Sequence, residues 1–156
     1  METYTQLFAK LKATNDCWEC VGPQPASRVD EIERKYNFTL PKSFRDYLTQ
    51  LGGVEFLDAH YTSIDDDYLD DTDGFIRNTN MIRSQVGMPE SMLALQYDHD
   101  ADRIACLDLS AMNGDECPVI WYHPFLGRVI GPCAENFREF FESIVRDWSA
   151  ESSDGG

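Results

Sequence analysis

The segment 29–53 constrains the fold most strongly, because it predicts two amphipathic helices joined by a short turn: VDEIERKYNFTLPKSFRDYLTQLGG. The first helix covers about Val29 to Tyr36, and Ser27 is expected to cap its N-terminus. The second begins near Pro41, where a missing backbone N–H costs nothing. Gly52-Gly53 supplies the left-handed backbone that ends a helix. Along the second helix, apolar residues recur with i, i+3, i+4, i+7 spacing at Phe44, Tyr47, Leu48 and Leu51.

A helix at each end of the chain and a central block of strands make up the rest. The N-terminal helix is predicted over Thr3–Lys12, followed by a loop over Asn15–Ser27. The C-terminal helix follows Asn136, with Glu139 placed to complete a capping box. A short helix is expected from about Asn78. Strands are predicted at Val54–Leu57, Met92–Gln96, Arg103–Leu109, Pro118–His123 and Arg128–Ile130. This order predicts one α+β domain over residues 1–150, with helices packed on an antiparallel or mixed β-sheet, and a frayed tail over 151–156.

The net charge of −15 is concentrated in the middle of the chain. Residues 1–53 carry seven acidic and seven basic residues, residues 54–117 carry fifteen and three, and residues 118–156 carry six and three. Such a charge argues against nucleic acid as a partner, because phosphate binding needs Lys and Arg. It suits a partner with a basic surface, whose approach it would accelerate. A merely solubilising acidic surface is the alternative, and charge alone favours that alternative.

Two acidic clusters are candidate cation sites. One is the run from Asp65 to Asp73. The other is Asp98, Asp100 and Asp102, which have the D-x-D-x-D spacing of a calcium loop. That loop needs Gly at its sixth position and Glu at its twelfth, where this chain has Arg103 and Leu109. Exposed acids in a turn are therefore favoured over a cation site, and no metal or other cofactor is predicted.

Cysteine and histidine residues do not form a recognisable catalytic or metal-binding pattern. Cys17 and Cys20 form a C-x-x-C, but no second C-x-x-C or H-x-x-x-H completes a zinc site. His60, His99 and His123 lie outside any catalytic motif. An odd number of scattered cysteines indicates a reducing cytoplasm. No apolar run is long enough for a membrane span, and the N-terminus is unlike a signal peptide. These observations predict a cytoplasmic protein that is not an enzyme.

The helix–Leu-Pro–helix–Gly-Gly unit, with its Ile32-Glu33 pair, resembles the opening of the SUKH superfamily. The resemblance continues through Met88-Pro89 to Leu95, Asp98–Asp102, Ile104–Asp108, Ile120–His123 and Asn136–Val145. One departure is the loop Tyr97–Asp102, which lacks the glycines usual there. The superfamily groups fungal regulators of cell-wall synthesis with bacterial immunity proteins, and its members mostly bind other proteins. The resemblance therefore implies a binding function.

The resulting hypothesis is an immunity protein that binds and neutralises a cognate bacterial toxin. The resemblance implies that many such toxins are nucleases, which present basic surfaces. The alternative is a non-catalytic regulatory or scaffold module for an endogenous partner. Tyr61 and other aromatic residues near the acids are expected to contribute more binding energy than the charges. The sequence does not predict the oligomeric state. The candidate contact residues are Asp65, Asp66, Asp67, Tyr68, Asp70, Asp71, Asp73, Phe75, Tyr97, Asp98, Asp100 and Asp102.

Overall fold

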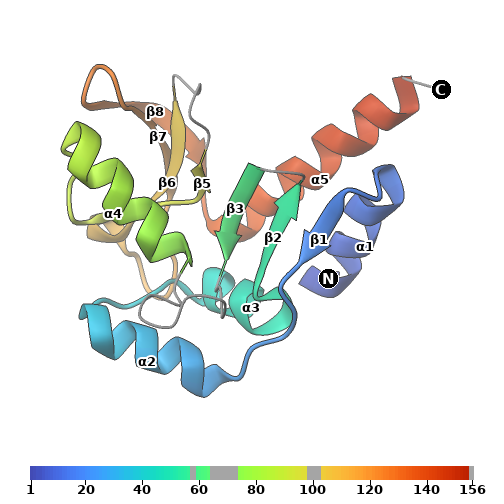
Figure 1. Cartoon of the computed structure of the whole chain (residues 1–156), viewed down its shortest axis with the longest axis horizontal. Coiled ribbons are helices and arrows are strands. Elements are labelled where there is room, and N and C mark those ends of the chain that lie inside the picture. The colour runs from blue at the N-terminus through green and yellow to red at the C-terminus, as the bar shows by residue number, and fades with distance from the viewer. Residues whose placement is uncertain (57–58, 64–73, 98–102, 155–156) are drawn as a thin grey trace.

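The computed structural model of the chain describes residues 1–56, 59–63, 74–97 and 103–154 (Figure 1). The described α-helices are α1 (Tyr4–Thr14), α2 (Ala26–Tyr36), α3 (Lys42–Leu51), α4 (Gly74–Val86) and α5 (Phe137–Asp154). The strands are β1 (Trp18–Cys20), β2 (Gly53–Phe56), β3 (Ala59–Ser63), β4 (Met92–Ala94), β5 (Gln96–Tyr97), β6 (Ile104–Asp108), β7 (Val119–His123) and β8 (Arg128–Ala134). None of the described helices has the length and apolar character to cross a membrane.

The strands form two four-stranded sheets, ordered β1-β2-β3-β5 and β4-β6-β7-β8. Every strand pairing in them is antiparallel. The predicted α+β class is confirmed. The strand predicted over Met92–Gln96 is wrong as a single element, because the chain leaves one sheet at Ala94 and joins the other at Gln96. Leu95 lies between them, and its N–H donates to the Ala105 carbonyl at 2.8 Å.

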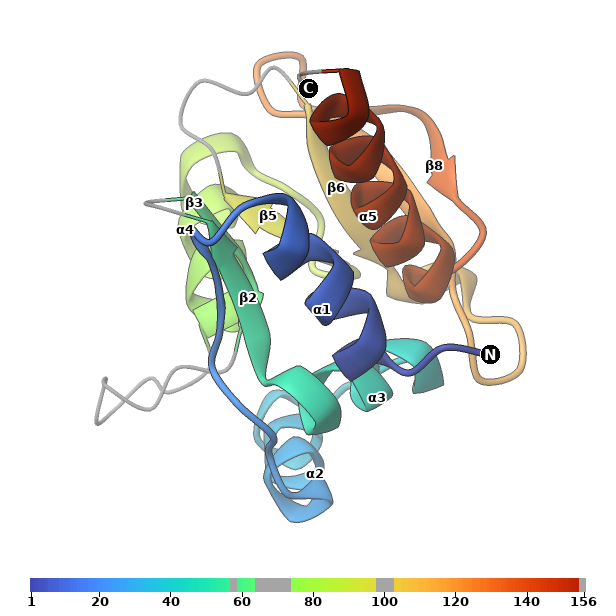
Figure 2. The same cartoon turned by 90° about the vertical axis from the view of Figure 1, so that its right-hand side faces the viewer.

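The sheet β4-β6-β7-β8 lies between α4 on one side and α5 on the other (Figures 1 and 2). Residues Ala105 and Leu107 of β6 belong to the main core cluster with Phe137 of α5. The residues that alternate with them, such as Cys106, belong to a second cluster with Ile82 of α4. Both faces of β6 are therefore buried, which explains why Ile104–Leu107 is buried throughout.

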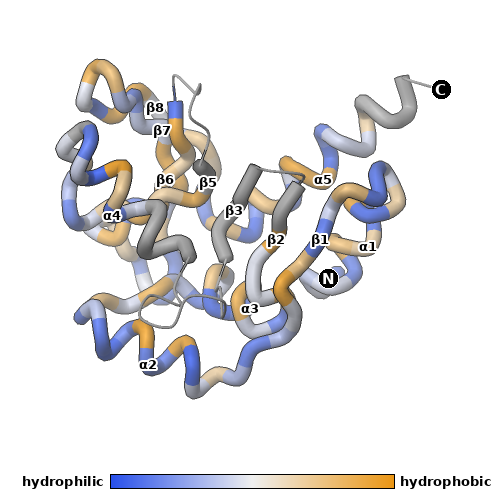
Figure 3. The backbone as a smooth tube through the Cα atoms, in the orientation of Figure 1, coloured by the Kyte–Doolittle hydropathy of each residue, from blue (hydrophilic) through white to orange (hydrophobic). Residues whose placement is uncertain are grey.

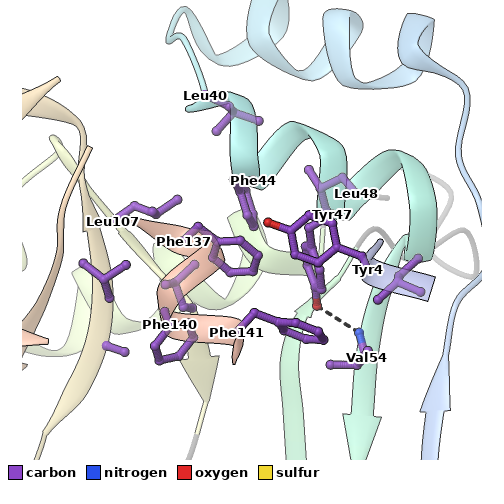
Figure 4. Close-up of a cluster of buried hydrophobic side chains, with 14 of the residues drawn as sticks. Tyr4, Leu40, Phe44, Tyr47, Leu48, Val54, Leu107, Phe137, Phe140 and Phe141 are labelled. Carbon is purple, nitrogen blue, oxygen red and sulfur yellow. Dashed lines mark hydrogen bonds between the residues drawn. The ribbon is translucent and has the colours of Figure 1, made fainter. Parts of the chain in front are cut away.

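Aromatic side chains from three helices meet in the main core (Figure 4). The rings of Tyr47 and Phe137 have centroids 4.7 Å apart, and Phe44 meets Phe137 edge-on at 5.0 Å. The Tyr47 hydroxyl accepts a hydrogen bond of 3.0 Å from the buried Val54 N–H. This bond ties the middle of α3 to the start of β2. It therefore anchors α3 to the sheet β1-β2-β3-β5.

Most helix ends lie near their predicted positions. The starts of α2 and α4 and the end of α5 differ. Gly52 ends α3 at φ 71° as predicted, whereas Thr3, predicted as the first helical residue, caps α1 in a capping box with Gln6. The loop predicted over Asn15–Ser27 is wrong, because β1 forms there by pairing with β2 and α2 already begins at Ala26. Ser27 consequently lies inside α2, whose N-cap position is Pro25.

Two further helices are longer than expected. The short helix predicted from about Asn78 begins at Gly74 and runs to Val86. The C-terminal helix α5 is capped by Asn136, whose side-chain oxygen accepts from the Glu139 N–H at 2.9 Å. It continues to Asp154, into the segment expected to form a tail. The Glu139 carboxylate accepts from the Glu135 N–H at 3.1 Å, one residue before the position expected for a capping box.

Candidate protein-binding surfaces

The Ile32-Glu33 pair of the helix–Leu-Pro–helix unit has a structural role. Ile32 is buried in the main core. The Glu33 carboxylate accepts a hydrogen bond of 2.7 Å from the Leu40 N–H and forms an ion pair with Arg45 of α3. Arg45 also bridges to Asp30 at 2.7 Å. Glu33 therefore holds the turn and both helices together, and its charge is neutralised within the unit.

An open hollow of about 460 Å³ lies beside this unit, lined by Asp30, Glu33, Arg34, Asn37, Phe38 and Thr39. Its two carboxylates already bind Arg45. Asn37, at φ 55°, ends α2 in the left-handed conformation and shapes the rim. The lining combines one exposed cation with internally paired acids, so the hollow offers no concentrated charge to a small ligand.

A second hollow, of about 230 Å³, lies at the N-terminus of α3 and is lined in part by Tyr4, Ser43, Glu116 and Arg138. The Glu116 carboxylate accepts from both the N–H and the hydroxyl of Ser43, so it caps α3 from a distant loop. The Arg138 guanidinium lies 5.2 Å from the centre of the Tyr4 ring. Burial raises the pKa of Tyr4 above its ordinary value of 10.0, although the Arg138 charge acts in the opposite direction. These groups are engaged with one another, which indicates a structural role.

The predicted contact residues are divided between described and undescribed parts of the chain. Phe75 lies in the first turn of α4, Tyr61 in β3 and Tyr97 in β5. The remaining candidates lie outside the described residues. They are Asp65, Asp66, Asp67, Tyr68, Asp70, Asp71, Asp73, Asp98, Asp100 and Asp102.

Strand pairing nevertheless locates the points where the two acidic segments leave the fold. The segment 64–73 follows Ser63, the last residue of β3, which lies opposite Gly53 of β2. The segment 98–102 follows Tyr97 of β5, which pairs with His60 near the start of β3. Because β3 and β5 are antiparallel, the two segments leave from opposite ends of β3. The structure therefore does not bring their attachment points together at one end of the sheet.

The hairpin formed by β7 and β8 exposes four apolar side chains, two in its turn and two at the start of β8. Phe125 is 75% exposed, Leu126 57%, and Val129 and Ile130 45% each. The turn appears as a hydrophobic tip at the upper left of Figure 3. A Phe-Leu pair in a turn, where polar residues are usual, was the available signal. We call Phe125, Leu126, Val129 and Ile130 the hairpin patch.

His123 holds the turn of the hairpin in place. Its Nδ1 accepts from the Leu126 N–H at 3.1 Å, and its carbonyl accepts from the Gly127 N–H at 2.8 Å. Gly127 has φ 66°, a conformation that a side chain would strain. The imidazole also meets the Phe125 ring edge-on at 6.0 Å. His123 is therefore engaged in the turn and has a structural role.

The five cysteines differ in burial, and Cys133 is intermediate between the exposed and the buried ones. Cys17 and Cys20 of the C-x-x-C are exposed free thiols. Cys106 and Cys117 are buried, and burial raises the pKa of each to about 12. Within the described residues, no three His, Cys, Asp or Glu side chains gather in a way that could hold a metal ion.

The fold and motifs above agree with a comparison against known families. The chain matches the family described as SUKH_6, SMI1-KNR4 cell-wall, over residues 26–141. The match begins at the first residue of α2 and ends within α5, so it includes the helix–Leu-Pro–helix unit and both sheets apart from β1. This family includes toxin-immunity proteins, and its domains generally bind partners without catalysing reactions. Because the match covers nearly three quarters of the sequence, the chain belongs to the SUKH (SMI1-KNR4) family.

Proposed function

We propose that this protein is a cytoplasmic immunity protein that binds a cognate toxin with a basic surface and blocks its activity. The observation that carries the proposal is the position of the charge within the family domain. The match over residues 26–141 includes both acidic segments, and residues 54–117 carry fifteen acidic residues against three basic ones. The largest excess of negative charge in the chain, in residues 54–117, therefore lies within the part that matches the family.

The ion pairs of the N-terminal part support the proposal that the acidic segments attract the partner. In the N-terminal part, acids are paired within the fold: Asp30 and Glu33 with Arg45, and Asp46 with Lys42 at 2.8 Å. The segments 64–73 and 98–102 contain nine aspartates and no Lys or Arg. Excess charge of one sign attracts a partner of the opposite sign and accelerates its encounter, and salt weakens the effect.

Aromatic residues beside the acids would supply the contact energy. Buried aromatic side chains usually dominate binding, whereas charges at the rim mainly govern the association rate. Tyr68 lies within the first segment, and Phe75 and Tyr97 border the two segments. The proposal thus assigns attraction to the aspartates and affinity to these rings.

The test combines growth protection with binding measurements. The chain is co-expressed with each candidate toxin domain encoded near its gene, and affinity is measured at low and high salt. The variant D65K/D66K/D67K is compared with E31K/E90K/D147K, which makes the same charge change at exposed acids elsewhere. A third variant, D98K/D100K/D102K, tests the second segment.

We expect the segment variants to lose affinity and salt dependence, and the control to retain both. Equal affinities for all variants would contradict the role of the acidic segments. Failure of the unaltered chain to protect against any of these candidates would contradict the immunity function. That second result would favour a regulatory module for an endogenous partner, in line with the cell-wall description of the family.

A further inference from the structure

The hollow of about 230 Å³ at the N-terminus of α3 brings together polar side chains from separate parts of the chain. Those that concern its binding capacity come from α1, α3, the loop before β7 and α5, and are Tyr4, Asp46, Glu116 and Arg138 respectively. The structural contacts described above use only part of the hydrogen-bonding capacity of these residues. The unused part indicates what the hollow can bind.

The hydroxyl of Tyr4 is the first unused group. Tyr4 is 3% exposed, and its hydroxyl has no hydrogen-bond partner in the part of the chain that the structure describes. Such a group is costly to bury, so folded proteins rarely contain one without a reason. In Figure 4 its oxygen points towards Phe44, in the first turn of α3. Burial raises the pKa of Tyr4, and the charges of Arg138, Asp46 and Glu116 act on the same hydroxyl. Because these three residues line the hollow, the hydroxyl faces it.

Arg138 supplies further hydrogen-bond donors beside that hydroxyl. Its side chain is 16% exposed, and its guanidinium lies 5.2 Å from the centre of the Tyr4 ring. The Nε donates to Glu142 at 2.6 Å, which fixes the orientation of the group. Its two terminal nitrogens have no hydrogen-bond partner among the described residues. A guanidinium fork of this kind matches the two oxygens of a carboxylate.

Two carboxylates at the same hollow each keep one oxygen for a further donor. Asp46 binds Lys42 through Oδ2 at 2.8 Å, and Glu116 accepts both hydrogen bonds from Ser43 through Oε1. Within the described ranges, Asp46 Oδ1 and Glu116 Oε2 have no partner. An ammonium group, which has three donors, suits these two oxygens.

The balance of charge and the volume restrict the ligand. Lys42 and Arg138 bring two positive charges to the hollow, and Asp46 and Glu116 bring two negative ones. A phosphate or a simple cation would therefore meet opposing charge, whereas a small zwitterion satisfies both kinds of group. The volume lies below the roughly 300–1,000 Å³ of sites for drug-sized ligands, so the ligand is small.

We propose that this hollow binds a free α-amino acid, with its carboxylate held by Arg138 and the Tyr4 hydroxyl and its ammonium group held by Asp46 and Glu116. The ligand supplies the acceptor that the buried hydroxyl lacks. It also gives a reason for keeping a hydroxyl whose removal should not destabilise the free protein. This binding is independent of the immunity function.

The test is an NMR titration of the full chain with glycine and with L-alanine, observed at the backbone amides of Ser43 and Arg138. Acetate and methylammonium, at the same concentration and ionic strength, present the two halves of the ligand separately. We expect both amino acids to shift these amides saturably. Acetate and methylammonium should bind at least about 10-fold more weakly, because each leaves one set of charged groups unpaired.

Variants separate binding from stability. Tyr4→Phe should raise the amino-acid Kd about 10-fold or more without lowering the urea midpoint of the free protein. Tyr47→Phe is the matched control, because it removes a hydroxyl of the same core that binds a backbone N–H instead. It should lower the midpoint and leave the Kd unchanged. Arg138→Lys keeps the charge but loses the fork and should weaken binding, whereas Arg146→Lys, at an exposed position of the same helix, should not.

The absence of saturable shifts at Ser43 and Arg138 with both amino acids overturns the proposal and leaves the hollow to water only. Acetate binding as tightly as L-alanine also overturns it, because the ammonium group would then contribute nothing. An unchanged Kd in Tyr4→Phe contradicts the role of the hydroxyl, on which the proposal depends.

Discussion

Glu116 and Ser43 are 73 residues apart in the sequence and are joined by two hydrogen bonds. The Ser43 N–H and hydroxyl donate to the same carboxylate oxygen, at 3.0 and 2.8 Å. Pro41, the N-cap residue of α3, makes no side-chain cap. A residue from the loop before β7 therefore does what a local Ser, Thr, Asn or Asp does at most helix starts.

Replacing Glu116 should therefore destabilise the protein through α3. We expect Glu116→Ala to lower the free energy of unfolding by about 1–2 kcal/mol, the usual value of a helix cap. Glu116→Gln, which keeps an acceptor oxygen, should lose less. Asp115→Ala is the matched control, because its backbone carbonyl rather than its side chain accepts from the Lys42 N–H. Urea denaturation measures all three, and an equal loss in the control would contradict the capping role.

Glu33 should be a second stabilising carboxylate. Glu33→Ala removes both the acceptor for the Leu40 N–H and the partner of Arg45, and should cost about 1–3 kcal/mol of unfolding free energy. Glu33→Gln should fall between this variant and the wild type. Glu31, an exposed neighbour on the same helix, provides the control Glu31→Ala, which should change stability by less than ~0.5 kcal/mol. Similar losses at both positions would show that Glu33 has no special role.

Two tyrosines of the same core should respond differently to removal of the hydroxyl. Tyr47→Phe leaves the buried Val54 N–H without its acceptor and should cost about 1–3 kcal/mol. The Tyr4 hydroxyl is buried without a hydrogen-bond partner among the described residues, so Tyr4→Phe should be neutral or stabilising. Thermal or urea unfolding of the two single variants decides the matter. A larger loss at Tyr4 would indicate an ordered water or another partner for its hydroxyl.

The thiols should react in a defined order. Exposed Cys17 should react first with a disulfide reagent in the native protein, and Cys20 more slowly because burial and then Glu19 raise its pKa. Cys106 and Cys117 should react only when urea unfolds the chain. Mass spectrometry of the labelled peptides assigns each site. Native labelling of Cys106 at the rate of Cys17 would contradict the packing of β6.

Stability should decrease at alkaline pH. Burial raises the pKa of Cys106 from 9.0 to about 12, so the folded state keeps a proton that the unfolded state releases. This stabilising contribution is complete below pH 9 and is lost as the pH rises from 9 through 12. Cys106→Ala should reduce the fall in urea midpoint between pH 9 and 11. An identical slope in this variant would show that the Cys106 thiol makes no contribution.

Local patterns in the sequence were sufficient for the elements whose partners lie within a few residues. The helix stripe at Phe44, the left-handed stop at Gly52 and the cap at Asn136 depend on i, i+3 and i+4 neighbours, and all three are confirmed. The family and the α+β class followed from these elements and their order. The chemical character of the proposed binding segments, rich in aspartate and tyrosine, is equally a property of the sequence.

Only the tertiary structure decided the features that depend on distant partners. The loop residues Trp18–Cys20 become a strand because β2 pairs with them, and the strand predicted over Met92–Gln96 divides because two different sheets accept its halves. Glu116 caps a helix that begins far from it in the sequence. Phe125 is left exposed at the turn between β7 and β8, whereas Phe137 is buried in the main core. Burial and long-range hydrogen bonds are properties of the assembled chain, so the sequence determined the elements and their chemistry, whereas packing determined their neighbours and the surface left exposed.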